Sequence, residues 1–211
     1  MNMSKNVIIT IGRQFGSGGR EIGSMLAERL NLPLYDKNLV ELAAEKLDIS
    51  EDTADSVDET ALSGFLSTYA YAPGTIMPYV GRVDYLEPIN DKMFYAQAGI
   101  IRELAKKGPA IFIGRCADYV LDGKAECLNV FICADKADRI KRTMELFDLT
   151  EKKAADKVKK MDRERRYYYE TYTGKDWGSV GSHDLVLNVS RLGMERAAKD
   201  LELIYKGMIE D

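Results

Sequence analysis

The fold of this chain is decided near its N-terminus by the stretch Ile8-Ile9-Thr10-Ile11-Gly12-Arg13-Gln14-Phe15-Gly16-Ser17-Gly18-Gly19-Arg20-Glu21-Ile22-Gly23. It starts as an apolar run rich in β-branched residues, becomes a glycine-dense turn, and continues into residues 24–30, whose apolar side chains recur at helical spacing. Glycines let the backbone adopt positive φ, so that successive N–H groups converge at the start of the helix. This arrangement of strand, loop and helix predicts a site for anions, phosphate above all.

Three interpretations of the loop compete. The first is the phosphate loop of nucleotide kinases, G-x-x-x-x-G-K-[ST]. Gly18 fits its last glycine, whereas Gly19 stands where the lysine belongs, so that Arg20 is the nearest cation. The second is a structural glycine turn without a ligand.

The third interpretation is a dinucleotide-binding loop. Gly12, Gly16 and Gly18 fit a G-x-x-x-G-x-G pattern, and Asp36 follows at about the distance of a ribose-binding acid. Against it, Glu21 takes the place of the third glycine of G-x-G-x-x-G. We therefore favour the phosphate loop.

Length and composition predict one soluble domain over residues 1–211, because 211 residues with 45% hydrophobic content can bury one substantial core. A formal charge of −4 argues against nucleic acid as a partner. Three cysteines without C-x-x-C spacing and a single histidine, His183, argue against a disulfide framework or a zinc site. No apolar run approaches 18 residues, so we expect a cytoplasmic location and no membrane partner.

Short apolar strands alternate with amphipathic helices along the rest of the chain. Such alternation predicts an α/β fold with a parallel sheet and right-handed crossovers. The strands are expected at 32–35, 110–113, 128–133 and 183–189, and the helices at 38–47, 91–107, 135–147, 150–172 and 194–208.

Two charged residues follow directly after predicted strands. Asp36 and Arg115 stand at the carboxyl ends of their strands, the edge at which parallel α/β sheets bind ligands. The planar guanidinium of Arg115 suits a phosphate group. An alternative for Asp36 is that it caps the helix beginning at Asn38.

Residues 48–91 differ in composition from the rest of the chain. An acidic start is followed by aromatic residues, glycines and prolines without a steady period, which predicts an insertion of short helices and loops. Arg82 is the only basic residue between Lys46 and Lys92. The insertion is interpreted either as a flap on the substrate side or as a surface or oligomer contact, and a homodimer is compatible with the second.

The segment 150–180 contains the most charged part of the chain. Arg163 and Arg166 share one helical face, which points either to a solvated helix with ion pairs or to a lid that places arginines over a phosphate. After a phosphate loop we favour the lid, because phosphoryl transfer develops charge that arginines stabilise only if they close over it.

Five segments of the chain together resemble the cytidylate kinase-like family, relatives of the bacterial cytidylate kinases. The resemblance covers nearly the whole chain except residues 48–90. The segments are Val7-Ile8-Ile9-Thr10-Ile11, residues 13–23, Tyr35-Asp36-Lys37, Ile113-Gly114-Arg115-Cys116-Ala117-Asp118 and Asp184-Leu185-Val186-Leu187-Asn188.

The resemblance implies a three-layer P-loop nucleotide-kinase fold, in which helices flank a five-stranded parallel sheet. Residues 48–91 would be the insertion on the nucleoside monophosphate side, and residues 150–180 the arginine-bearing lid. Arg115 corresponds to the family's arginine that contacts the monophosphate, although Cys116 replaces the following aspartate. The other residues carried over are Gly16, Ser17, Gly18 and Gly19 for the loop, Asp36 for the acid after the second strand, Arg139 and Arg142 flanking the lid, and Arg163 and Arg166 within it.

Two departures from the family concern the phosphate loop. Its lysine is replaced by Gly19, and the hydroxyl next to Mg²⁺ by Glu21. We expect Arg20 to supply the missing charge, and Glu21 and Asp36 to hold Mg²⁺ through water.

The resemblance implies transfer of a phosphoryl group from ATP, with Mg²⁺, to a nucleoside monophosphate, most directly CMP or dCMP. The glycine loop, Arg20, Glu21, Arg139 and Arg142 would bind ATP; Asp36, Arg82 and Arg115 would bind the acceptor; Arg20, Arg163 and Arg166 would be catalytic. Two alternatives stay open, a nucleotide-binding regulator without turnover and a kinase of another small phosphate acceptor.

Overall fold

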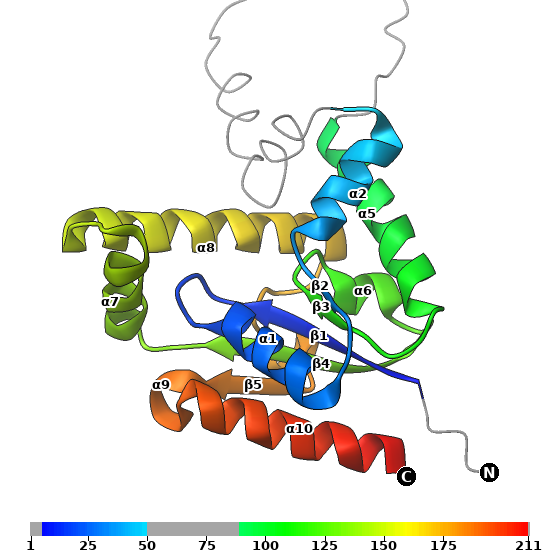
Figure 1. The fold of residues 1–211 in the computed structure, drawn as a ribbon. Coiled ribbons are helices and arrows are strands. Elements are labelled where there is room, and N and C mark those ends of the chain that lie inside the picture. Colours follow the sequence, from blue (N-terminus) through cyan, green and yellow to red (C-terminus); the bar gives the residue numbers. More distant parts are fainter. Residues whose placement is uncertain (1–5, 50–88, 211) are drawn as a thin grey trace, which may run out of the picture.

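A parallel sheet of five strands lies at the centre of the part of the chain that the computed structural model describes, residues 6–49 and 89–210 (Figure 1). Its order is β2-β3-β1-β4-β5, and every neighbouring pair is parallel. This confirms the predicted fold class. The strands are β1 Val7–Arg13, β2 Leu34–Tyr35, β3 Ile111–Ile113, β4 Glu126–Cys133 and β5 Leu185–Asn188.

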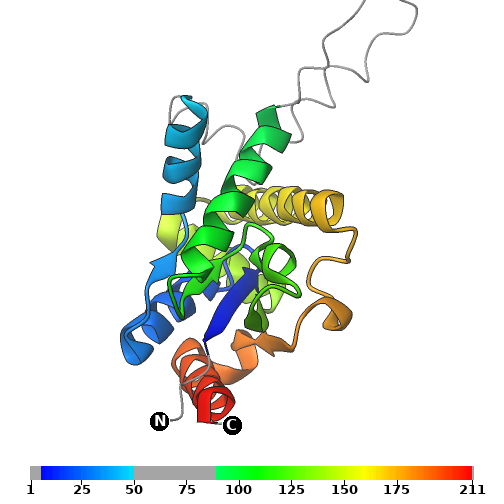
Figure 2. The same cartoon turned by 90° about the vertical axis from the view of Figure 1, so that its right-hand side faces the viewer.

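Helices cover both faces of the sheet. Figure 2 shows α10 on one side of β1, and α5 and α8 on the other. Ile22 and Leu26 of α1 pack with α10 against one face, while Phe94 and Ile101 of α5 pack against the opposite face. The helices are α1 Gly19–Leu30, α2 Asn38–Leu47, α5 Ile89–Ala105, α6 Ala117–Leu121, α7 Lys136–Phe147, α8 Glu151–Thr173, α9 Val189–Leu192 and α10 Met194–Glu210, with a 3₁₀ turn η1 Val180–Ser182.

Strand β1 occupies the middle of the sheet because its side chains are apolar in both directions. Residues 7–9 and Ile11 have no exposed surface, and β1 pairs with β3 on one side and β4 on the other. Strands buried on both faces are near-continuous apolar runs. The glycine loop that follows β1 therefore opens at the centre of the carboxyl edge, where ligands of such sheets bind.

The last predicted strand is shorter in the structure than in the sequence interpretation. Strand β5 ends at Asn188, whose side chain accepts a hydrogen bond from the N–H of Ser190 at 3.0 Å. This cap starts helix α9, so residues 183 and 184 precede the strand and Val189 follows it.

Helix α8 is a single helix of 23 residues that ends at Gly174, which has φ of 66°. Its C-terminal half is fixed to α5 and α6 by aromatic residues. Tyr172 stacks on Phe94 with ring centroids 4.0 Å apart and donates to Asp91 at 2.8 Å, and Tyr169 donates to Asp118 at 2.6 Å. The predicted lid segment 150–180 therefore contains a long helix whose C-terminal half is held against α5 and α6.

Most of the predicted insertion at 48–91, including Arg82, lies outside the described residues. Cys116, Cys127 and Cys133 form no disulfide, and Cys116 is buried. Burial raises the pKa of the Cys127 thiol to about 11. Within the described ranges, no helix combines the length and apolar character needed to cross a bilayer.

Candidate phosphate site

The loop between β1 and α1 has the backbone that the glycines predict. Gly16 and Gly18 adopt φ of 75° and 83°, and Gly18 is the N-cap of α1. A Cβ atom on Gly16 would lie 2.8 Å from the carbonyl oxygen of Arg139, so no larger residue fits there. Because the first N–H groups of a helix have no intrahelical acceptor, this turn presents donors to an anion.

A cavity of about 650 Å³ opens in front of the loop, large enough for a nucleotide. It lies between the start of α1, the ends of β2 and β3, and helices α7 and α8. Its polar wall includes Arg13, Gly16, Gly18, Gly19, Arg20, Glu21, Asp36, Lys37, Arg115, Arg142 and Arg165, and its apolar wall Phe15, Leu146, Phe147 and Met161.

Four of the predicted site residues form two ion pairs at this cavity. Arg20 Nε lies 2.8 Å from Asp36 Oδ2, and Arg142 lies 2.9 Å from Glu21. Helix α2 starts after Lys37 without a side-chain cap. The alternative that Asp36 caps α2 is therefore wrong, and its carboxylate belongs to the cavity.

Arg115 lies where the sequence places it, at the carboxyl end of β3, and it is only 4% exposed. Arg115 and Cys116 have φ of 59° and 54°, a left-handed conformation that costs energy in residues other than glycine and is concentrated at functional sites. The pKa of Arg115 is lowered to about 10, chiefly by burial. The positive charges of Arg13 and Arg165 also act to lower this pKa, whereas Tyr168 and Asp36 act to raise it. Three guanidinium groups thus gather at one wall.

Arg165 is the arginine that α8 brings to the cavity. Its guanidinium donates to the carbonyl oxygen of Arg13 at 3.4 Å and lies 5.5 Å from the centre of the Phe15 ring. Arg163 is exposed and does not line the cavity, and Arg166 is 60% exposed, 4.0 Å from Glu170.

The sequence does hold a signal for Arg165. Residues 154, 158, 161, 165 and 168 follow alternating steps of four and three, and all but 165 are apolar or aromatic. Such a stripe is the face that a helix turns toward the protein. Arg165 interrupts it, whereas Arg163 and Arg166 lie beside it.

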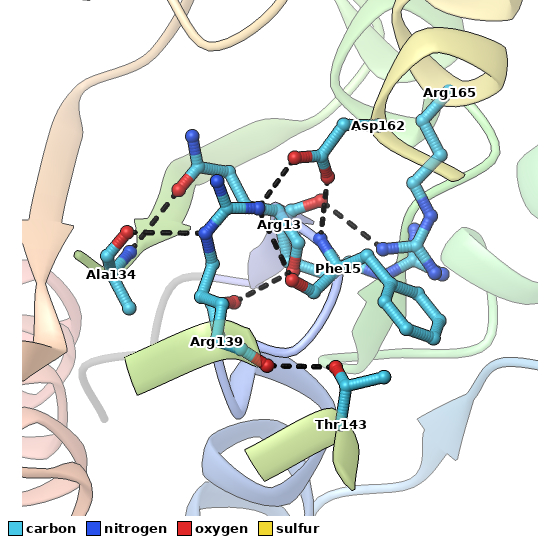
Figure 3. A network of polar contacts seen from close by, with 9 residues as sticks. Arg13, Phe15, Ala134, Arg139, Thr143, Asp162 and Arg165 are labelled. Atoms are coloured by element: carbon cyan, nitrogen blue, oxygen red, sulfur yellow. Dashed lines mark hydrogen bonds and ion pairs between the residues drawn. The ribbon is translucent and has the colours of Figure 1, made fainter. Parts of the chain in front are cut away.

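Asp162 and Arg139 hold the loop from behind (Figure 3). Asp162 of α8 accepts the N–H of Phe15 at 2.8 Å and forms an ion pair with Arg139 of α7. Arg139 also donates to the carbonyl oxygens of Phe15 and Ala134, each at 3.2 Å. Arg139 does not line the cavity, so its placement favours a positioning role over direct contact with a nucleotide. The sequence interpretation missed Asp162, which has no motif of its own.

A second, small cavity of about 30 Å³ adjoins the first. It is lined by Thr10, Asp118, Tyr169, Trp177 and His183 and shares Arg13, Arg115 and Arg165 with the large cavity. Its size accommodates about one water molecule. His183 is directed to the carbonyl oxygen of Ser179 at 3.2 Å, which agrees with a residue at the edge of the strand.

The described residues include no group of three or more side chains able to bind a metal. Mg²⁺ that accompanies a nucleotide needs only one or two carboxylates, because phosphate oxygens and water complete its shell. Glu21 and Asp36 stand at the cavity wall and fit this requirement.

The model of the cytidylate kinase-like family matches residues 8–191, from the start of β1 to α9. The chain belongs to the cytidylate kinase-like family. The resemblance stated from the sequence is thereby confirmed, and the family and fold are of the nucleotide-kinase type. A search of curated proteins finds no match.

Several solved structures share this fold. An uncharacterized protein from Eubacterium ventriosum ATCC 27560 is 27% identical, with a TM-score of 0.69 over 96% of this chain and 98% of that one. A shikimate kinase from Bacteroides thetaiotaomicron has a TM-score of 0.52 and 15% identity over 95% of this chain and 98% of its own. TT1252 from Thermus thermophilus has a TM-score of 0.52 and 17% identity over 93% and 96%. The last two share the fold.

Proposed function

We propose that this member of the cytidylate kinase-like family transfers the γ-phosphoryl group of ATP to a nucleoside monophosphate, with CMP or dCMP as the leading acceptor. One observation carries the proposal. One cavity of nucleotide size is bounded by the glycine loop and by arginines from β1, from the segment after β3, and from α8. Amides and guanidinium groups that converge from separate elements suit a polyphosphate with a second phosphate beside it.

The residues divide between donor and acceptor. Gly16, Ser17, Gly18 and Gly19 would hold the phosphates of ATP, with Arg20, Glu21 and Arg142 at the edge of the loop. Asp36 and Arg115 would face the acceptor, together with Arg82. Mg²⁺ would be held through water by Glu21 and Asp36, and it supplies neutralisation of the phosphate charge.

The proposed lid function moves from Arg163 and Arg166 to Arg165. Arg165 lines the cavity, whereas Arg163 does not and Arg166 lies beside Glu170. An arginine placed on the transferring phosphoryl group contributes about 10³ to 10⁵ in rate where such residues have been measured.

In the proposed reaction, an oxygen of the acceptor phosphate forms a bond to the γ-phosphorus of ATP. The bond from that phosphorus to the bridging oxygen of the β-phosphate breaks, and its electron pair leaves with ADP. The products are ADP and a nucleoside diphosphate. The acceptor phosphate is already ionised near neutral pH, so no general base is required, and catalysis rests on positioning and charge.

Two other functions use the same cavity. The missing loop lysine favours a nucleotide-binding regulator that has lost turnover. A kinase of another small phosphate acceptor would use the same glycine loop and the same arginines at the cavity wall.

The test is a coupled assay of ADP release with CMP, dCMP, UMP and AMP, run beside calorimetry with MgATP. We expect turnover with CMP or dCMP well above that with AMP. Binding of MgATP without turnover on any acceptor would favour the regulator, and absence of binding would overturn the proposal.

A further inference from the structure

We propose that Arg13, and not Arg20, supplies the positive charge that a phosphate loop normally takes from its lysine. This inference rests on the proposed function and names the residue that compensates for Gly19. Arg13 is the last residue of β1, six positions before the substituted lysine site.

Arg13 packs against the position from which the lysine would start. A Cβ atom built on Gly19 would lie 2.7 Å from Cβ of Arg13 and 3.2 Å from its Cγ. The stem of the Arg13 side chain therefore occupies the space in which a lysine side chain at position 19 would begin. Gly19 has no positive φ, so its backbone does not require glycine. A lysine at position 19 and an arginine at position 13 would therefore compete for the same space.

Arg13 also lies at the cavity in which a phosphate would bind. Arg13 lines the large cavity in front of the loop and the small cavity beside it. Its charge acts on buried Arg115, whose proton it makes easier to lose. Arg13 thus shares a wall with Arg115 and Arg165, and a phosphate bound there would be attracted by all three cations.

The backbone of Arg13 is held in the central sheet. Arg13 is paired in register with Ile132 of β4, and its carbonyl oxygen accepts from Arg165 at 3.4 Å. A cation on a strand of the central sheet costs little reorganisation when a phosphate binds.

Arg20 lacks these properties. Its side chain is 58% exposed and is paired with Asp36 at 2.8 Å. Arg20 lies in the first turn of α1 with its side chain largely exposed, whereas the Arg13 side chain packs directly against Gly19 of the loop.

The experiment exploits the shared space of positions 13 and 19. Arg13→Gln is expected to lower kcat by about 100-fold or more, the loss typical when one transition-state donor is removed. Arg20→Gln is expected to lower it by less than about tenfold. Gly19→Lys alone introduces the clash with Arg13 and is expected to lower kcat. Combined with Arg13→Gly, which also removes the Cβ atom that lies 2.7 Å from the new one, the same lysine has room. The double variant is expected to recover at least about tenfold over Arg13→Gly.

Melting temperature and the Kd for MgATP are measured on every variant, with Arg196→Gln of α10 as the matched control, since Arg196 is exposed and paired with Asp200. An Arg13→Gln variant that melts earlier but keeps its kcat and Kd would overturn the inference, because the residue would then only pack over Gly19. A larger loss at Arg20 than at Arg13 would overturn it as well. If Arg13→Gln folds poorly, Arg13→Lys replaces it in the comparison, because it retains the positive charge and the aliphatic stem. Recovery of kcat in the double variant then still tests the inference.

The two proposals fail differently. Wild-type protein without ADP release and without MgATP binding overturns the proposed function, and this inference with it. Wild-type protein that binds MgATP without turnover leaves Kd as the readout: an increase of about tenfold or more in Arg13→Gln supports the inference, and an unchanged Kd overturns it.

Discussion

The carboxylate of Asp162, in the middle of α8, accepts the backbone N–H of Phe15 in the phosphate loop across 147 positions of sequence at 2.8 Å. The same carboxylate pairs with Arg139, which donates to the carbonyl oxygen of Phe15. Both polar groups of one loop residue are therefore held by α7 and α8. These contacts join the phosphate loop to α8, the helix that carries Arg165. We therefore expect a displacement of the loop to be accompanied by a displacement of α8.

Replacement of Asp162 by alanine is expected to lower the free energy of unfolding by about 3 kcal/mol, because it leaves the poorly exposed Arg139 without its charge partner. It should also weaken MgATP binding, since the loop loses a support. Chemical denaturation and calorimetry measure the two effects. The control is Asp156→Asn, an exposed aspartate on the same helix. Equal stability and equal Kd in wild type and Asp162→Ala would show that the contact does not support the loop.

Arginine replacements on α8 distinguish its two faces. We expect Arg165→Ala to lower kcat more than Arg163→Ala or Arg166→Ala, by about 100-fold, because only Arg165 of the three lines the cavity. Steady-state kinetics with saturating ATP and acceptor give the comparison. A greater loss at position 163 or 166 would restore the face predicted from the sequence.

Carboxylates at the cavity should set the requirement for metal. Glu21→Gln and Asp36→Asn are expected to raise the Mg²⁺ concentration at half-maximal rate by about threefold to tenfold each, and chelation by EDTA should abolish turnover. The matched control is Glu28→Gln, exposed and further along α1. Identical Mg²⁺ titrations for all three variants would remove both carboxylates from the metal site.

Acceptor binding should depend on pH through Arg115. Burial lowers the pKa of this guanidinium to about 10, and a group with a lowered pKa loses its proton earlier as pH rises. The contribution of its positive charge to phosphate binding is therefore complete below pH 9 and is lost as pH rises through about 10. Acceptor Kd measured from pH 7 to 10.5 should rise at the upper end, and Arg115→Gln should flatten the profile. The same upward bend in Arg115→Gln would assign it to another group.

Several elements follow from local sequence alone. The β-branched run 8–11 makes a strand that is buried on both faces, and the glycines at 16 and 18 adopt the positive φ that a nest of amides requires. Alternation of strands and helices then leads to a parallel sheet, and the combined segments lead to the cytidylate kinase-like family. The strands, helices and glycine turn depend on interactions between residues close in sequence, and the rule that crossovers are right-handed then converts their order into a parallel sheet.

The face that each arginine presents was decided only by the tertiary structure. Arg139 lies behind the loop, Arg165 replaces Arg163 and Arg166 at the cavity, and Arg13 fills the space over Gly19. Charged residues lie on several faces of α8, so the sequence alone does not show which face turns toward the cavity. The contacts that decide this join residues more than 140 positions apart. The need for positive charge beside a phosphate predicts arginines at such a site. The packing of α8 against the loop determines which of these arginines lines the cavity.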